Sequence, residues 1–142
     1  MKDDRLSEAR YALRGHVRCA VCRPDGSLHE SEDRGVLPML LWLDEDRDFL
    51  RGSSVADKIV GRAAAMLMVY GGVSEVYASV ISRGALDYLR DHGVDVSYTN
   101  TCIAISNRRG DGICPMERAV APVSDPEKAF EVLKEKCLGH KE

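Results

Sequence analysis

The segment RRGDGICPMERAV, residues 108–120, places a thiol between a basic glycine-rich loop and a predicted helix start. Cys114 stands at the N-cap position of that helix, with Glu117 in its first turn. The exposed N–H groups and the dipole of a helix start, together with Arg108 and Arg109, favour the thiolate form of Cys114. A thiolate there is a candidate nucleophile, whereas a Cys-Pro helix start also suits a purely structural cap. Both interpretations stay open.

A second candidate group lies in the most apolar part of the chain. Residues 55 to about 70 are predicted to form a buried central helix, capped by Ser54 and ended by two glycines. Lys58 and Arg62 are then four residues apart on one helix face, and such a like-charged pair costs about 0.2–0.5 kcal/mol. They require solvent, nearby acids or a bound anion. Asp57, beside them, is a candidate general base.

The motif Cys19-Ala20-Val21-Cys22, with His16 and His29 nearby, raises the question of a metal site. No second CxxC follows at zinc-ribbon spacing, and residues three apart on a strand point to opposite faces. We therefore expect at least one of these thiols to be buried in the core. We expect no metal and no cofactor.

The composition narrows the class of protein. The chain has 142 residues, of which 44% are hydrophobic and 30% charged, with a net charge of −3. This length fits one domain over residues 1–142, and the charge gives no sign of binding to duplex nucleic acid. No apolar run approaches the ~20 residues that a membrane span needs. A charged N-terminus and five cysteines favour a cytoplasmic protein with reduced thiols.

The elements that must position these side chains follow from turn signals and periodicity. Residues 4–10 open a helix, and two strands over residues 11–22 and 28–32 form a hairpin across Arg23-Pro24-Asp25-Gly26. The remaining expected elements are helices at 36–43, 55–70, 84–92, 115–121 and 125–138 and strands at 76–81 and 94–105. Strand, helix and strand in that order predict a parallel crossover.

The segments SVADKIVGRAAAMLMVYGGVSEVYASVIS and NRRGDGICPMERAV, in this order of elements, resemble a small prokaryotic family of unknown function. That family looks like a divergent, metal-free branch of the cytidine-deaminase-like superfamily. The resemblance covers residues 11 to about 121. It implies an α/β, cytidine-deaminase-like three-layer fold, a mixed sheet with helices on both faces.

The zinc deaminases open their central helix with a His or Cys ligand two residues before a Glu, and the next helix with Pro-Cys-x-x-Cys. At the corresponding positions Val55 cannot bind metal, Asp57 stands in the place of the Glu, and both cysteines are missing. The resemblance therefore implies a pocket without activated zinc water.

If the segment carrying Cys114 folds over the carboxyl ends of the strands, it closes a crevice of the kind that binds ligands in α/β proteins. We expect this pocket to bind an anionic small molecule, a nucleotide-like metabolite, and Cys114 and Asp57 are the candidate catalytic residues. A non-catalytic module that senses a ligand or contacts another protein is the alternative, and a homodimer through apolar residues near Met39 or Trp42 stays open. The expected ligand-binding residues are Lys58, Arg62, Arg83, Asn107, Arg108, Arg109 and Glu117.

Overall fold

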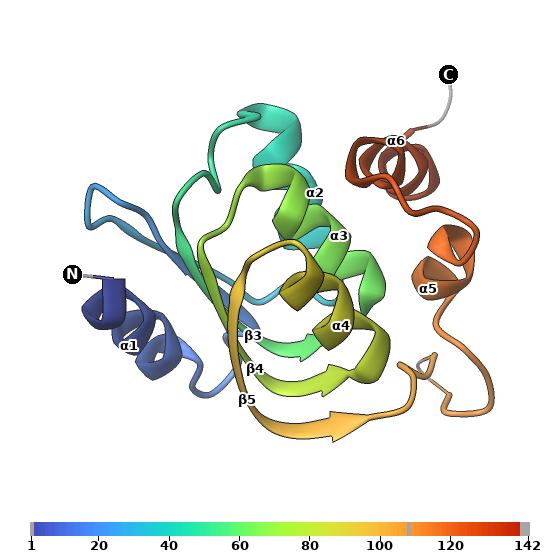
Figure 1. Cartoon of the computed structure of the whole chain (residues 1–142), viewed down its shortest axis with the longest axis horizontal. Helices are drawn as coiled ribbons and strands as arrows, with labels where there is room; N and C mark the ends of the chain where they lie inside the picture. Colours follow the sequence, from blue (N-terminus) through green and yellow to red (C-terminus); the bar gives the residue numbers. More distant parts are fainter. Residues whose placement is uncertain (1, 108, 140–142) are drawn as a thin grey trace.

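The computed structural model describes residues 2–107 and 109–139, with side chains from residue 4 onward. Over these residues the chain forms a five-stranded mixed sheet, ordered β2-β1-β3-β4-β5, and six helices (Figure 1). β1 pairs antiparallel with β2 and β3, whereas β3, β4 and β5 run parallel. The predicted hairpin, parallel crossover and mixed α/β sheet are confirmed. The elements are α1 (Lys2–Ala12), β1 (Cys19–Cys22), β2 (Leu28–Ser31), α2 (Leu37–Glu45), β3 (Ser54–Val60), α3 (Arg62–Gly71), β4 (Glu75–Ser82), α4 (Arg83–Asp91), β5 (Asp95–Cys102), α5 (Pro115–Val120) and α6 (Pro126–Cys137).

Helices cover both faces of the sheet. α1 packs on one face, where Ala9 meets Ala20, Cys22 and Ala56, and α3 and α4 pack on the other (Figure 1). The two faces are separated by the alternation of side chains along β1 and β3, since successive strand residues point to opposite sides. Cys19 therefore joins the core beneath α3 while Cys22 joins the core beneath α1. Both thiols are buried, as expected for core residues.

The predicted helix over residues 55–70 is wrong in its first part. Residues 54–60 form β3, the middle strand of the sheet, and the helix begins only at Arg62. A short apolar run that is buried on both sides has no periodicity that separates strand from helix, and the alanines that favour a helix start at Ala63. Ser54 is therefore no helix cap, and its hydroxyl instead donates to the buried Glu75 carboxylate at 2.5 Å. Lys58 and Arg62 do not share a helix face.

The central helix α3 occupies the middle of the larger core. Met66, Leu67 and Met68 are fully buried, because α2, α4, α5 and α6 all contact this helix. The helix ends at Gly71, and Gly72 adopts a left-handed φ of 81°, as the glycine pair predicts.

α2 continues to Glu45, two residues beyond its expected end. The acidic residues at its C-terminus were expected to stop it at Leu43, but Lys134 of α6 forms an ion pair with Asp44 at 2.7 Å. The cation offsets the unfavourable charge at the negative end of the helix. Within the described residues, no helix combines the length and apolarity needed to cross a membrane.

Candidate functional site

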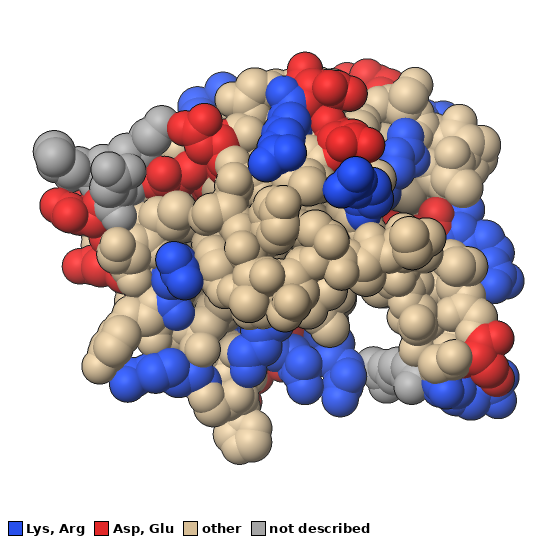
Figure 2. Space-filling view, turned by 60° about the horizontal axis from the view of Figure 1, so that its bottom comes forward, with Lys and Arg blue, Asp and Glu red and all other residues tan. Residues whose placement is uncertain are grey.

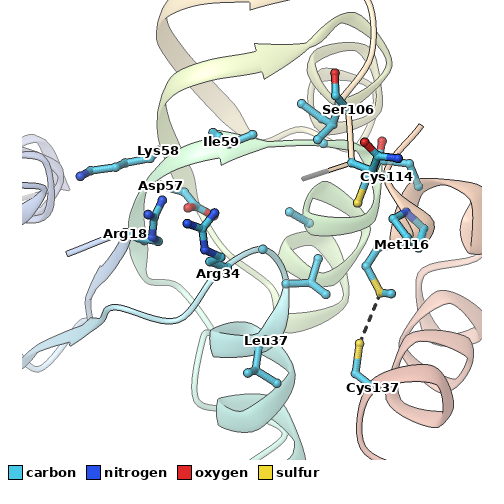
Figure 3. Close-up of a pocket in the computed structure, with 18 of the residues that line it drawn as sticks. Arg18, Arg34, Leu37, Asp57, Lys58, Ile59, Ser106, Cys114, Met116 and Cys137 are labelled. Atoms are coloured by element: carbon cyan, nitrogen blue, oxygen red, sulfur yellow. Dashed lines mark hydrogen bonds between the residues drawn. The ribbon is translucent and has the colours of Figure 1, made fainter. Parts of the chain in front are cut away.

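A pocket of about 850 Å³ opens at the carboxyl end of β3 (Figure 3). Its walls come from residues 34–37 at the start of α2, 57–59 of β3, the loop 105–107 and the start of α5 at 114–117. In Figure 3, Asp57, Arg18 and Arg34 lie at one end of the pocket, and Cys114, Met116 and Cys137 lie at the other. The structure thus brings together the two candidate catalytic residues, Asp57 and Cys114, in one pocket.

Asp57 is the most unusual group of the pocket. Its side chain is 4% exposed, and its Oδ2 has no hydrogen-bond partner among the described residues. Burial raises the pKa of Asp57 well above its ordinary value, and the backbone N–H groups of Lys58 and Ile59 oppose this only in part. Burial also raises the pKa of the neighbouring Cys19 thiol, and the Asp57 charge adds to that rise. Protonation of Asp57 is therefore favoured by its surroundings.

Cys114 takes the predicted N-cap position of α5, but its side chain makes no capping hydrogen bond. It is half-buried and lines the pocket. Of the two arginines expected beside it, Arg109 is exposed and lies 3.7 Å from Asp111, while Arg108 lies outside the described residues. The Cys137 thiol, at the same end of the pocket, donates to the Met116 sulfur at 3.3 Å.

Glu117 has a structural role that the sequence did not reveal. Its carboxylate accepts the backbone N–H groups of Arg62 at 2.9 Å and Ala63 at 2.7 Å, so it caps the N-terminus of α3. Gly61 makes room for this cap, because a Cβ there would lie 2.7 Å from the Glu117 carboxyl carbon and 2.8 Å from Ile105. The positive end of α3 is thus occupied by the chain itself, while Glu117 also lines the pocket, and its contact with a ligand stays a prediction.

Of the other residues expected to bind the ligand, two lie outside the pocket and two line it. Arg62 and Arg83 do not line it: Arg62 donates to two carbonyl groups of the α5–α6 connection, and Arg83 is exposed on the first turn of α4. Lys58 lies at the rim, but its ammonium group donates to the Gly15 carbonyl oxygen at 3.0 Å. The side chain of Asn107 lines the pocket and also holds its own loop, since its amide donates to Asp111.

Arg18 and Arg34 are the charged pocket residues that sequence reasoning missed. Arg34 is exposed and Arg18 is half-buried, and both precede the elements that bring them to Asp57, namely β1 and α2. Neither belongs to a motif: Arg18 reaches the pocket because β1 pairs with β3, and Arg34 reaches it from the segment that precedes α2. Figure 2 shows Lys and Arg side chains gathered along the lower border of the face it presents, beside a hollow in the surface.

The described part of the chain contains no group of three His, Cys, Asp or Glu side chains that could hold a metal ion. The zinc chemistry of the deaminases therefore has no ligand set among these residues. Cys19 and Cys22 lie in different cores on opposite faces of the sheet, so they do not form one ligand pair. The Cys22 thiol donates to Glu8 at 3.7 Å.

The fold and the pocket define a small α/β protein with an acid, thiols and guanidinium groups at the carboxyl end of β3, in the parallel part of a mixed sheet. The chain belongs to the DUF1893 family of domains of unknown function, whose model matches residues 9–137. It is similar to the crystal structure of a DUF1893 family protein, TM1506, from Thermotoga maritima, with a TM-score of 0.83 and 28% identity. That similarity covers 96% of this chain and 92% of the other. No curated protein matches the chain.

Proposed function

We propose that this pocket binds an anionic small molecule, a nucleotide-like metabolite. The observation that carries the proposal is the buried Asp57, with an oxygen left unpartnered by the described chain, on the wall of a pocket that Arg18 and Arg34 also line. Native proteins rarely leave a buried polar oxygen unsatisfied, so the partner that Oδ2 of Asp57 lacks within the described chain is a water, an ion or a ligand, and we propose the ligand. Guanidinium groups supply planar donors that suit phosphate and carboxylate oxygens.

The start of α2 forms part of the same wall. Residues 35–37 line the pocket, and the N–H group of Leu37 donates to the carbonyl oxygen of Arg34. The apolar walls, including Val36, Ile59 and Ile105, suit the body of a metabolite that carries its charge at one end.

A placement in the cytidine-deaminase-like superfamily is part of the same proposal. It is supported by three parallel strands that α3 and α4 connect along the chain and by the position of the pocket at the carboxyl end of β3.

A cytoplasmic setting is also proposed, in keeping with five cysteines that are all free.

The test is a thermal-shift titration with nucleoside monophosphates and with short dicarboxylates. We expect at least one of these probes to stabilise the wild-type protein, and Arg34→Gln to weaken its affinity by about tenfold, the effect of one charged hydrogen bond. Arg83→Gln is the matched control, because Arg83 is an exposed arginine outside the pocket. The absence of any stabilisation, or an equal loss in both variants, would contradict binding in this pocket.

A catalytic version of the function depends on Cys114, since this half-buried thiol lines the same pocket as Asp57. If Cys114 is a nucleophile, it reacts with iodoacetamide faster than a reference thiol outside the pocket, and a bound anion protects it from alkylation. Cys102 of β5, which is also half-buried but lies outside the pocket, is the reference. Equal alkylation of the two thiols, with no protection, favours the non-catalytic binding or sensing module.

A further inference from the structure

The neighbours of Asp57 determine which ligand groups its carboxyl group can bind. Arg18 and Arg34 line the same end of the pocket, Cys19 is its partner across the β1–β3 ladder, and Ala78 is its partner on β4. From the far wall, Cys114, Glu117 and Arg109 face the same space. No ion pair to Asp57 occurs among the described residues, and its Oδ2 is unsatisfied there.

We infer that Asp57 acts as a neutral carboxylic acid that donates a hydrogen bond to an oxyanion of the ligand. This inference rests on the proposed function, because it assigns a role to a wall of the same pocket. A cationic ligand group is disfavoured beside Arg18 and Arg34, and an anionic group is repelled by an ionised carboxylate. The neutral acid is the form that can donate a hydrogen bond to an incoming anion, while the guanidinium groups of Arg18 and Arg34 supply the positive charge that attracts it.

The burial of Asp57 supports this form. A buried carboxyl group with no ion-pair partner among the described residues loses its solvation when it ionises, so the proton stays on the acid to a higher pH. A buried neutral acid can donate a hydrogen bond where an ordinary aspartate can only accept one. The ligand class that follows is a phosphate or carboxylate whose oxygens accept from Asp57 and from the arginines together.

The consequence is an affinity that depends on pH. When Asp57 ionises, the donor is lost and a negative charge faces the bound anion, so affinity falls as pH rises through the pKa of Asp57. Burial raises the pKa of the Cys19 thiol well above its ordinary value, so this neighbour does not produce the same dependence. The fall reaches about tenfold for each pH unit above that pKa, since one proton is linked to binding.

The experiment measures the affinity of the full chain for sulfate and for oxalate by calorimetry from about pH 6 to about pH 8.5, a range in which both probes stay fully ionised. Sulfate reports on a phosphate-like ligand and oxalate on a carboxylate. The wild-type protein is compared with Asp57→Asn, whose amide donates a hydrogen bond at every pH, and with Asp87→Asn, an exposed acid of α4. We expect the pH dependence to vanish in Asp57→Asn and to persist in Asp87→Asn.

A second measurement does not depend on the variant. The carbon-13 signal of the Asp57 carboxyl group is titrated with and without the probe, and we expect the bound anion to raise the pKa further. A lower pKa in the bound state, or an Asp57 that is ionised when the anion is bound, overturns the inference and leaves the proposed function standing. If neither probe binds any variant, the proposed function itself fails. If affinity is flat with pH, the carbon signal must show a protonated Asp57 throughout, and an ionised one contradicts the inference.

Discussion

At the scale of single residues, two carboxyl groups with opposite surroundings define this protein. Glu117 is satisfied, because two backbone N–H groups of α3 donate to it, and Gly61 provides the space it needs. Asp57 is buried with one oxygen unpartnered within the described chain. Glu117 stabilises the fold by capping α3, whereas the burial of Asp57 costs free energy that the rest of the fold must offset. That difference separates a structural acid from a candidate binding group.

The cost of Asp57 predicts a pH-dependent effect of Asp57→Asn on stability. The pKa of Asp57 is raised in the folded protein, so the folded state binds more protons than the unfolded state above about pH 4. The contribution of Asp57 to wild-type stability is therefore greatest below that pH and falls as pH rises toward the folded pKa, whereas the amide has no such dependence. We expect the free energy of unfolding of Asp57→Asn, relative to wild type, to increase by up to about 1.4 kcal/mol per pH unit in this range.

Urea unfolding at several pH values measures this slope. Asp87→Asn is the control, because an exposed acid with no buried contact gives no comparable trend. A constant difference between Asp57→Asn and wild type at all pH values would show that Asp57 ionises in the folded state as readily as in the unfolded chain.

At the scale of elements, Arg62 connects three parts of the chain. Its guanidinium group donates to the carbonyl oxygens of Val120 at 2.7 Å and Val123 at 2.6 Å, and it lies over the Tyr88 ring. Tyr88 in turn donates to Ser124 at 2.8 Å. The connection between α5 and α6 is thus fastened to the first turn of α3 and to α4, and this fastening keeps Cys114 and Glu117 beside the pocket.

Arg62→Met should therefore destabilise the protein without weakening its response to an anion. Methionine keeps much of the side-chain volume but removes both hydrogen bonds, and charged hydrogen bonds contribute about 1.5–3 kcal/mol each. We expect a loss of several degrees in melting temperature, with the shift caused by a bound nucleotide or dicarboxylate retained. Arg83→Met, on an exposed arginine of α4, serves as the comparison. Unchanged stability with a lost ligand response would restore Arg62 to the binding site.

At the scale of the whole molecule, the sequence predicts the sheet and most of the helices but misplaces the centre. Hairpin, crossover and C-terminal helix follow from turn residues and periodicity, which are local signals. Residues 54–60 defeat this reasoning because the first four residues of β3 are all buried, and such a strand shows no alternation that separates it from a buried helix. The error moved Lys58 and Arg62 onto one helix and hid Arg18 and Arg34, whose place in the pocket depends on tertiary contacts. Asp57 and Cys114, selected from residue type, from the helix start at Cys114 and from the resemblance at Asp57, both line the pocket, and their chemical roles stay predictions.

The cap on α3 also shows how the C-terminal part of the chain is divided. Glu117 joins α5 to α3, whereas Ala129 and Leu133 anchor α6 directly in the main core. Glu117→Ala should cost about 1–2 kcal/mol, the value of a lost helix cap, and should loosen α5 without releasing α6. Hydrogen exchange should then accelerate at residues 114–120 and in the first turn of α3, while the amides near Leu133 keep their protection. Glu131→Ala, on an exposed acid of α6, is the control. If α6 exchanges together with α5 in Glu117→Ala, the two helices dock as one unit, and the wall of the pocket that carries Cys114 is only as stable as that docking.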